Sequence, residues 1–348
     1  MILHLVDGVR VAGGPPFEVR VAGGTRRYAR ARAADLERAL AALESGAPPP
    51  ARVFERAREL VDRDEGWRLD LAATLDVDEH ELPARLARIE RAELRRETRA
   101  NPSVVALVAH WSDGVGELGR KLCVPLAAGA AVLVCSDPRV PDAADVWCDA
   151  LLDAGLPRER LALLHGLDTT ELVRCASAPA RARIVVDDAA AAKALESTDS
   201  ARRWAVDWPC GTVLAAGGPG QPGPEEVLDL AFGVHAALGG QLDGRVGVVD
   251  VPARRHAAFV DDLARPLEEL AARLAAGERR RPRAIDRAME QRHAAVLQTL
   301  LEQGAAPVVV AERHGEPLFA PALFVNGEDF MSAVQSPPCV PVLVVRRV

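Results

Sequence analysis

Apolar and polar positions alternate along the chain with two different periods, and the period changes several times. Residues 1–30 alternate around Gly and Pro turns, which is typical of short strands. Apolar residues then recur at helical spacing, which predicts amphipathic helices over residues 33–45, 53–61 and 82–94. Farther along, short β-rich runs alternate with helical stretches. The predicted strands are 104–109, 131–134, 161–164 and 184–186, and the helices between them are 117–126, 142–152 and 169–175.

Strands that alternate with helices predict right-handed crossovers and a parallel sheet, which usually binds its ligands at the carboxyl ends of its strands. A Gly/Pro-rich segment near residue 217 divides the chain. The elements predicted beyond it are a helix over 225–238, a strand over 246–251, helices over 256–275 and 284–303, and strands over 308–310 and 342–345. We therefore predict an α/β protein with two domains, residues 1–216 and 217–348.

The composition excludes several classes of protein. The chain has 348 residues, of which 49% are hydrophobic and 27% charged, so it is neither disordered nor collagen-like. The 43 Lys and Arg against 50 Asp and Glu give a net charge of −7, which argues against a general nucleic-acid binder. No apolar stretch approaches the roughly 20 residues that span a bilayer, and the N-terminus lacks the pattern of a secretion signal. We therefore expect a cytoplasmic protein that neither spans nor binds a membrane.

Two motifs with known chemistry are weak or missing. The six cysteines are scattered and form none of the close Cys/His pairs of a structural zinc site, so no metal is predicted. The glycines Gly218, Gly220 and Gly223 match G-x-G-x-x-G, which presents backbone N–H groups to a pyrophosphate. Pro219 and Pro222 remove two of those donors, so the sequence favours an interdomain turn over a dinucleotide fingerprint.

Polar residues also follow two of the predicted strands, each with a functional and a structural interpretation. His110 follows the strand 104–109, where α/β enzymes place working residues, but a lone histidine there is more often structural. Asp187 and Asp188 follow the strand 184–186 and could bind a cation or a ribose. Capping of the alanine-rich helix that follows is the favoured interpretation.

The order of the segments resembles the aldehyde dehydrogenase superfamily over almost the entire chain. The resemblance rests on five segments: the opening VDGVRV…YARARAADLERALAAL, then PSVVALVAHWSDGVGELGRKLCVPLAAGAAVLVCSDPRVP, LLDAGLPRERLALLHG, FGVHAALGGQLDGRVGVVDVPARRHAAFVDDL and FAPALFV…QSPPCVPVLVV. It implies a Rossmann-type parallel sheet domain and a second α/β domain of catalytic type, which this sequence leaves incomplete at its C-terminus. It also implies oxidation of aldehydes with NAD or NADP.

The catalytic positions implied by this resemblance hold other residues. The cysteine nucleophile of Gly-Gln-x-Cys corresponds to Asp243, and a carboxylate does not readily replace a thiolate. The general-base glutamate of Glu-Leu-Gly-Gly corresponds to Ala215. The oxyanion asparagine corresponds to Ser112, and the adjacent Asp113 would oppose a developing anion.

The implied cofactor positions are altered too. Trp111 lies in the family's cofactor region, and the lysine of Lys-Pro-Ser-Glu corresponds to Cys135. The Gly-Ser-Thr turn that packs on the pyrophosphate corresponds to Asp187 and Asp188, whose charges would repel phosphates. The ribose-binding glutamate corresponds to Pro337.

We therefore predict a shortened, non-catalytic member of this superfamily that acts in binding or assembly, by self-association or alongside an active paralogue. Two alternatives remain open. The first is an active aldehyde or semialdehyde oxidoreductase with a relocated nucleophile, for which Cys210 and Cys339 are the candidates. The second is a metabolite sensor that binds an aldehyde without turnover. NAD or NADP is expected only if the family's function is retained.

Overall fold

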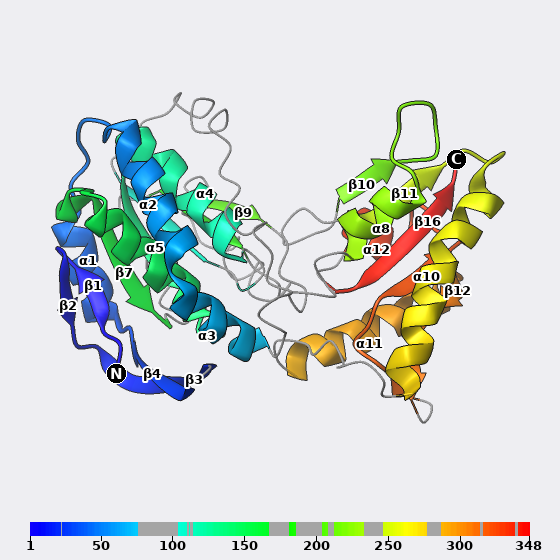
Figure 1. The fold of residues 1–348 in the computed structure, drawn as a ribbon, viewed down its shortest axis with the longest axis horizontal. Coiled ribbons are helices and arrows are strands. Elements are labelled where there is room, and N and C mark those ends of the chain that lie inside the picture. The colour runs from blue at the N-terminus through cyan, green and yellow to red at the C-terminus, as the bar shows by residue number, and fades with distance from the viewer. Residues whose placement is uncertain are drawn as a thin grey trace. The chain divides into compact units, whose positions relative to one another are not determined.

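The computed structural model divides the chain into two compact units. The first comprises Met1–Thr74 and Leu82–Trp208, and the second Leu75–Glu81 and Pro209–Val348, beside a predicted boundary at 216/217. Figure 1 shows the two units in one ribbon, coloured along the chain. The structure describes residues 1–21, 23–75, 104–109, 111, 114–166, 181–185, 204–207, 212–232, 246–276, 287–313, 316–337 and 340–348.

A seven-stranded sheet forms the centre of the first unit, with strand order β2-β1-β7-β6-β5-β8-β9. Neighbours from β7 to β9 pair in parallel, whereas β1 runs antiparallel to both β2 and β7. The bounds are β1 (His4–Val6), β2 (Val9–Val11), β5 (Val104–Val108), β6 (Ala131–Ser136), β7 (Leu161–His165), β8 (Arg181–Val185) and β9 (Trp204–Asp207). Every residue of β6 and β7 is buried, as expected for central strands that are covered on both faces.

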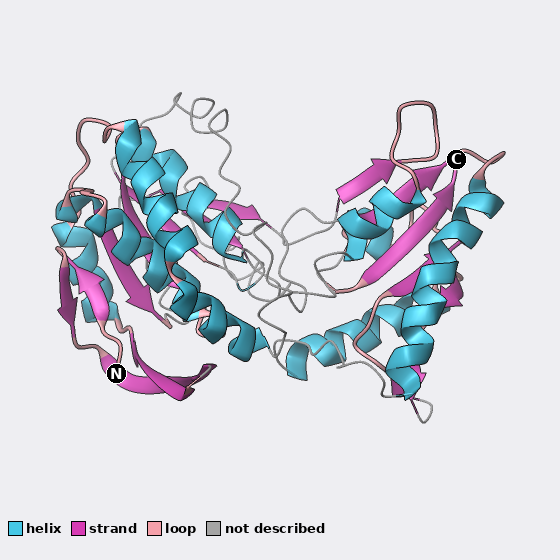
Figure 2. Ribbon diagram, in the orientation of Figure 1, coloured by secondary structure: helices cyan, strands magenta, loops and turns pink. Residues whose placement is uncertain are grey.

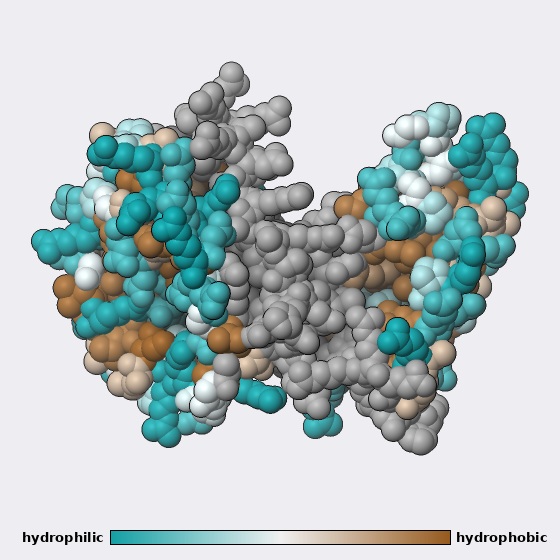
Figure 3. Space-filling model, viewed as in Figure 1, coloured by the Kyte–Doolittle hydropathy of each residue, from teal (hydrophilic) through white to brown (hydrophobic). Residues whose placement is uncertain are grey.

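Helices pack against this sheet, and a separate hairpin completes the first unit (Figure 2). The helices are α1 (Ala33–Ala42), α2 (Ala51–Arg63), α3 (Glu65–Leu75), α4 (Gly114–Ala127) and α5 (Pro141–Asp153), and the hairpin pairs β3 (Gly14–Val21) with β4 (Gly24–Arg30). The apolar positions of α1 join the core cluster beneath β5, β6 and β7. Helix α2 packs on α5, and the side of α2 that faces the viewer in Figure 3 is mostly polar. This is the amphipathic arrangement that the spacing predicts.

A five-stranded sheet with order β10-β11-β16-β15-β12 forms the second unit. The first four strands pair in parallel, and β12 runs antiparallel to β15. The bounds are β10 (Thr212–Ala215), β11 (Val246–Val251), β12 (Ala306–Val309), β15 (Ala322–Val325), β16 (Val342–Arg347), α8 (Pro224–Phe232), α10 (His256–Ala276), α11 (Arg287–Glu302) and α12 (Ser332–Gln335), with a small hairpin of β13 (Glu312–Arg313) and β14 (Glu316–Pro317). Helices α8 and α10 share one core with the sheet strands.

Most of the predicted elements are confirmed within the described residues, including the α/β class and the parallel sheet. The helices predicted over 82–94 and 169–175 lie outside those residues, and the helix predicted over 225–238 is described as far as Phe232. The strand β10 pairs with β11, so it lies in the second sheet, although the predicted boundary assigned it to the first domain. No helix in the described ranges is long and apolar enough to cross a membrane.

Candidate functional site

The carboxyl ends of β5, β6 and β7 bring together the polar residues nearest to the expected ligand edge of the first sheet. Strand β6 ends at Ser136 and is followed by Asp137, and Ser136 is in register with His165 at the end of β7. Trp111 follows β5. The strands β5, β6 and β7 run parallel, so their carboxyl ends lie at the same edge of the sheet and bring these residues together.

Hydrogen bonds join Trp111, which follows β5, to Asp137 and Arg139, which follow β6. The Trp111 backbone N–H donates to Asp137 Oδ2 over 3.0 Å, and Arg139 donates to the same carboxylate from its backbone N–H, Nε and Nη2 over 2.6 to 3.1 Å. The Arg139 guanidinium lies 5.8 Å from the centroid of the Trp111 ring, and the Trp111 residue is only 1% exposed. Both oxygens of Asp137 are therefore occupied by groups of its own chain.

Cys135 lies inside the core. It pairs in register with Val108 and Leu164 in the sheet, is 2% exposed, and packs in the apolar cluster that includes Leu36 and Ala39 of α1. The position that resembles the cofactor-binding lysine thus holds a short, buried thiol. Such a side chain supplies neither an ammonium group nor an exposed hydrogen-bond donor to a ribose.

The other two cysteines in the described part of the chain are also buried. Burial raises the pKa of the Cys123 thiol to about 12, and burial together with the Asp145 carboxylate raises the pKa of Cys148 well above its usual value. Within the described residues, none of the three thiols forms a disulfide bond. Because the thiolate is the nucleophile, the raised pKa values leave Cys123 and Cys148 unsuited to attack a carbonyl near neutral pH.

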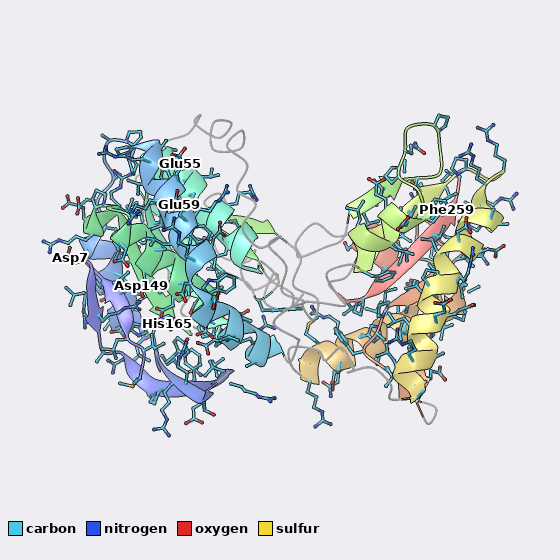
Figure 4. All side chains as sticks on the ribbon, in the orientation of Figure 1. Asp7, Glu55, Glu59, Asp149, His165 and Phe259 are labelled. Atoms are coloured by element: carbon cyan, nitrogen blue, oxygen red, sulfur yellow. The ribbon has the colours of Figure 1, made fainter. Side chains whose placement is uncertain are left out.

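A buried Ser–His–Asp arrangement, which sequence reasoning missed, lies beside this edge. Ser136 Oγ is 3.0 Å from His165 Nδ1, and His165 Nε2 is 3.6 Å from Asp145 Oδ1. Burial alone would raise the pKa of Asp145, but His165 and Arg10 outweigh it and lower that pKa. Ser136 is 3% exposed and His165, which Figure 4 labels, is completely buried. A substrate therefore has no approach to this hydroxyl, and the arrangement serves to join β6, β7 and α5.

The Gly-rich loop after β10 closes on itself. The Gly217 N–H donates to the Pro222 carbonyl over 3.1 Å, and the Gly218 N–H donates to Gln221 Oε1 over 2.8 Å. Gly217 has φ +75° and lies against Phe259 of α10, so a side chain there would be strained. These two N–H donors are used within the loop, which supports the interpretation as a turn rather than a phosphate cradle.

The remaining predicted positions divide between described and undescribed residues. Ala215 ends β10 and is exposed, and Pro337 is buried. His110, Ser112, Asp113, Asp187, Asp188, Cys210, Asp243 and Cys339 lie outside the described residues, so their roles stay predictions. Within the described ranges, no group of three or more His, Cys, Asp or Glu is arranged to hold a metal ion.

One further acidic position became visible only in the fold. Asp207 is the last residue of β9, at the carboxyl end of that strand, in register with Val185 of β8. The sequence analysis assigned no strand to residues 204–207, because four residues give too little periodicity to distinguish a buried strand from a loop.

Solved structures of aldehyde dehydrogenases share this arrangement over the chain. An aldehyde dehydrogenase C variant from Pseudomonas syringae, solved with NAD+ and octanal, matches with a TM-score of 0.77 at 19% identity, covering 100% of this chain and 80% of that one. A NAD-dependent benzaldehyde dehydrogenase from Corynebacterium glutamicum gives 0.77 at 15% identity, with 100% and 84% coverage. An NAD+ complex of an aldehyde dehydrogenase from Bacillus cereus gives 0.70 at 16% identity, with 100% and 79% coverage.

No protein-family model matches the chain, and no curated protein matches it in sequence. By class, this is a two-unit α/β protein whose first unit contains a largely parallel, Rossmann-type sheet. More particularly, the chain has the aldehyde dehydrogenase fold, as the order of its sequence segments predicts.

Proposed function

We propose that this protein is a non-catalytic binding or assembly protein built on the aldehyde dehydrogenase fold. The observation that carries the proposal is the burial of Cys135 at the position that resembles the cofactor-binding lysine. A dinucleotide needs charged or polar groups that reach its phosphates and riboses. The described residues at the implied cofactor positions do not fit that group, because Cys135, Trp111 and Pro337 are all buried within the protein's own packing.

The implied general-base position supports the same proposal. Ala215 offers a methyl group where a carboxylate would have to activate water. Asp243 and Ser112 replace the implied nucleophile and oxyanion donor in the sequence. Each replacement removes a different chemical step, so the proposal does not depend on a single position. The buried thiols Cys123, Cys135 and Cys148 form no disulfide within the described residues, which is compatible with the reducing cytoplasm that we propose as the protein's location.

We expect no thermal stabilisation of the purified chain by NAD or NADP, alone or with a panel of aldehydes. A ligand present at 100 times its dissociation constant stabilises a fold by about 2.7 kcal/mol, which is readily measured as a shift in Tm. The matched control is an active aldehyde dehydrogenase, such as that of Pseudomonas syringae, titrated in the same plate. A clear shift with either dinucleotide would refute the proposal.

The same titration separates the two alternatives. Dinucleotide binding with NADH or NADPH formation points to a relocated nucleophile, and Cys210→Ser and Cys339→Ser then show which thiol is required. Saturable stabilisation by an aldehyde without product formation points to a metabolite sensor.

We further propose that the assembly partner is a second copy of the chain or an active paralogue. Among the described strands, β10 is an edge of the second sheet, and its Val213 is 51% exposed. An edge strand with an exposed apolar side chain can pair with another chain, and a lysine on the edge prevents this. We expect Val213→Lys to weaken self-association by at least about tenfold, measured by sedimentation velocity over a concentration series.

The control for this variant is Leu301→Lys. Leu301 is also 51% exposed, and its replacement by lysine adds the same charge, but Leu301 lies on α11 rather than on a strand. If both variants weaken association equally, net charge rather than the β10 edge is responsible. If wild-type protein stays monomeric alone and with its paralogue, the assembly role is excluded.

A further inference from the structure

The N-terminal residues 1–21 and 23–32, here called the N-terminal strap, include the edge strands β1 and β2 of the first sheet and share few backbone hydrogen bonds with β7. Strand β1 pairs with β7 at the single register pair Leu5↔Leu163, and the Ala31 N–H donates to the His165 carbonyl over 2.8 Å. So few backbone bonds contribute little to holding the strap against β7. Side chains therefore hold the strap: Val6 and Ala31 pack in the core cluster of the first sheet, and polar contacts join the strap to α5 and β7.

Helix α5 presents three carboxylates to the strap. Asp142, Asp145 and Asp149 are spaced i, i+3 and i+7, which places them on one face of the helix. Arg10 bridges the last two, with Nη1 2.6 Å from Asp145 Oδ1 and Nη2 2.6 Å from Asp149 Oδ1. The Tyr28 hydroxyl donates to Asp142.

Arg26 adds a second cation at the Asp142 end of this face. Its Nη1 lies 2.9 Å from Asp142 Oδ1, and its Nη2 lies 2.5 Å from Asp70 Oδ2 on α3. Arg10 and Arg26 together neutralise much of the acidic face of α5 while the strap is in place.

His4 is the first residue of β1 and is completely buried. Its Nδ1 accepts the backbone N–H of His165 over 3.2 Å, so this nitrogen carries no proton and the ring is neutral. The two imidazole rings are 5.8 Å apart. The other ring nitrogen, Nε2, is packed against Gly13, where a Cβ atom would lie only 2.1 Å away.

We propose that the N-terminal strap is an acid-released latch and that His4 is its sensor. A proton on Nδ1 removes the acceptor of the His165 N–H and places a cation on a side chain that is completely buried. The groups that face His4 are His165 on β7, the Arg30 carbonyl on β4, Arg32 after β4, and Asp35 on α1, and the Tyr28 ring on β4 packs edge-on against the His165 ring. Release leaves the β7 edge unpaired and open to a strand from another chain.

The charges around His4 set the direction of the response. Burial and then the neighbouring His165 lower the pKa of His4 to about 4, which the Asp35 carboxylate only partly opposes. In the released strap the pKa returns towards 6.5, so the released form binds a proton more readily. The latch therefore holds above pH 6.5 and loosens as the pH falls from 6.5 to 4.

Three carboxylates of α5 modify this response. Burial raises the pKa of Asp142 and of Asp149, so their protonation near the acid end favours the closed strap and opposes His4. The lowered pKa of Asp145 keeps that carboxylate charged and bound to Arg10 over the same range. The His4 effect is therefore clearest between pH 7 and pH 5.

Native-state hydrogen exchange of the full chain tests the latch. After correction for the intrinsic pH dependence of exchange, the opening equilibrium of the β1 amides should rise about 20-fold between pH 7 and pH 5, while β6 amides stay unchanged. The variant His4→Asn keeps an acceptor for the His165 N–H but cannot titrate. Its opening equilibrium should change by less than about twofold over the same range.

Three results would overturn the proposal: an unchanged β1 opening in the wild type, an equal rise in β6, or an undiminished rise in His4→Asn. If His4→Asn does not fold, histidine NMR of the wild-type chain replaces it. The His4 resonance must then titrate below pH 5, and the β1 opening must increase with the first power of the proton concentration between pH 6 and pH 5. The latch does not depend on the proposed non-catalytic role.

Discussion

Replacing Trp147 by alanine should lower the free energy of unfolding of the first unit by about 3–5 kcal/mol. Trp147 is completely buried on α5, where it packs against α4 at Gly119. Truncation removes a large apolar surface and leaves a cavity between helices that the sheet holds in place. The loss is measured by urea denaturation followed by circular dichroism, with the m-value checked for a change in cooperativity.

The close contact between α4 and α5 provides the control for this prediction. A Cβ atom at Gly119 would lie 2.2 Å from Trp147 Cζ2, so Gly119→Ala should cost about 1–3 kcal/mol by overpacking. Adding Trp147→Phe to Gly119→Ala shortens the facing ring and should recover part of that loss. Simple additivity of the two single variants would show that the contact is not what limits this position.

Arg160→Met should lower the free energy of unfolding by about 3 kcal/mol. Arg160 is 4% exposed, and its guanidinium joins two loops: Nε and Nη2 donate to the Ala130 carbonyl over 3.2 and 2.8 Å, and Nη1 donates to the Ala47 carbonyl over 3.2 Å. Methionine keeps the apolar stem but leaves these carbonyls without their donors. The measurement is the same urea titration.

The neighbouring Arg158 provides a matched control. Its side chain is 68% exposed, and its contact with Asp7 spans 3.3 Å at the surface. We expect Arg158→Met to change the stability by less than about 0.5 kcal/mol, because exposed ion pairs contribute little. Equal losses for the two variants would show that the arginine content of this turn matters and that the carbonyl contacts do not.

The proposed loss of catalysis and the proposed acid latch depend on different residues. The first concerns the implied cofactor and base positions, represented in the described residues by Cys135 and Ala215. The second concerns His4 and the acidic face of α5. A dinucleotide-dependent shift in Tm would refute the first and leave the second intact, and pH-independent β1 exchange would do the reverse.

The sequence by itself determined the α/β class, most of the strands and helices, and the order of segments that matches the aldehyde dehydrogenase fold. These features depend on local periodicity, which shows which face of an element is buried. The residue types alone favoured a turn for the Gly-rich segment after β10, because its prolines remove N–H donors whatever the surroundings are.

Only the tertiary structure decided what each buried face meets. Ser136, Asp145 and His165 belong to no common sequence motif, yet they form one buried array. The bond between the His165 N–H and His4 spans 161 positions in the chain, and that between Arg10 and Asp145 spans 135. Burial makes these distant polar groups depend on one another. A buried donor or acceptor that loses its partner keeps its full desolvation cost, which is larger than the net stabilisation from an ordinary hydrogen bond. Local pattern carries no information on such partners, so the contacts of His4, Arg10 and His165 were visible only in the folded chain.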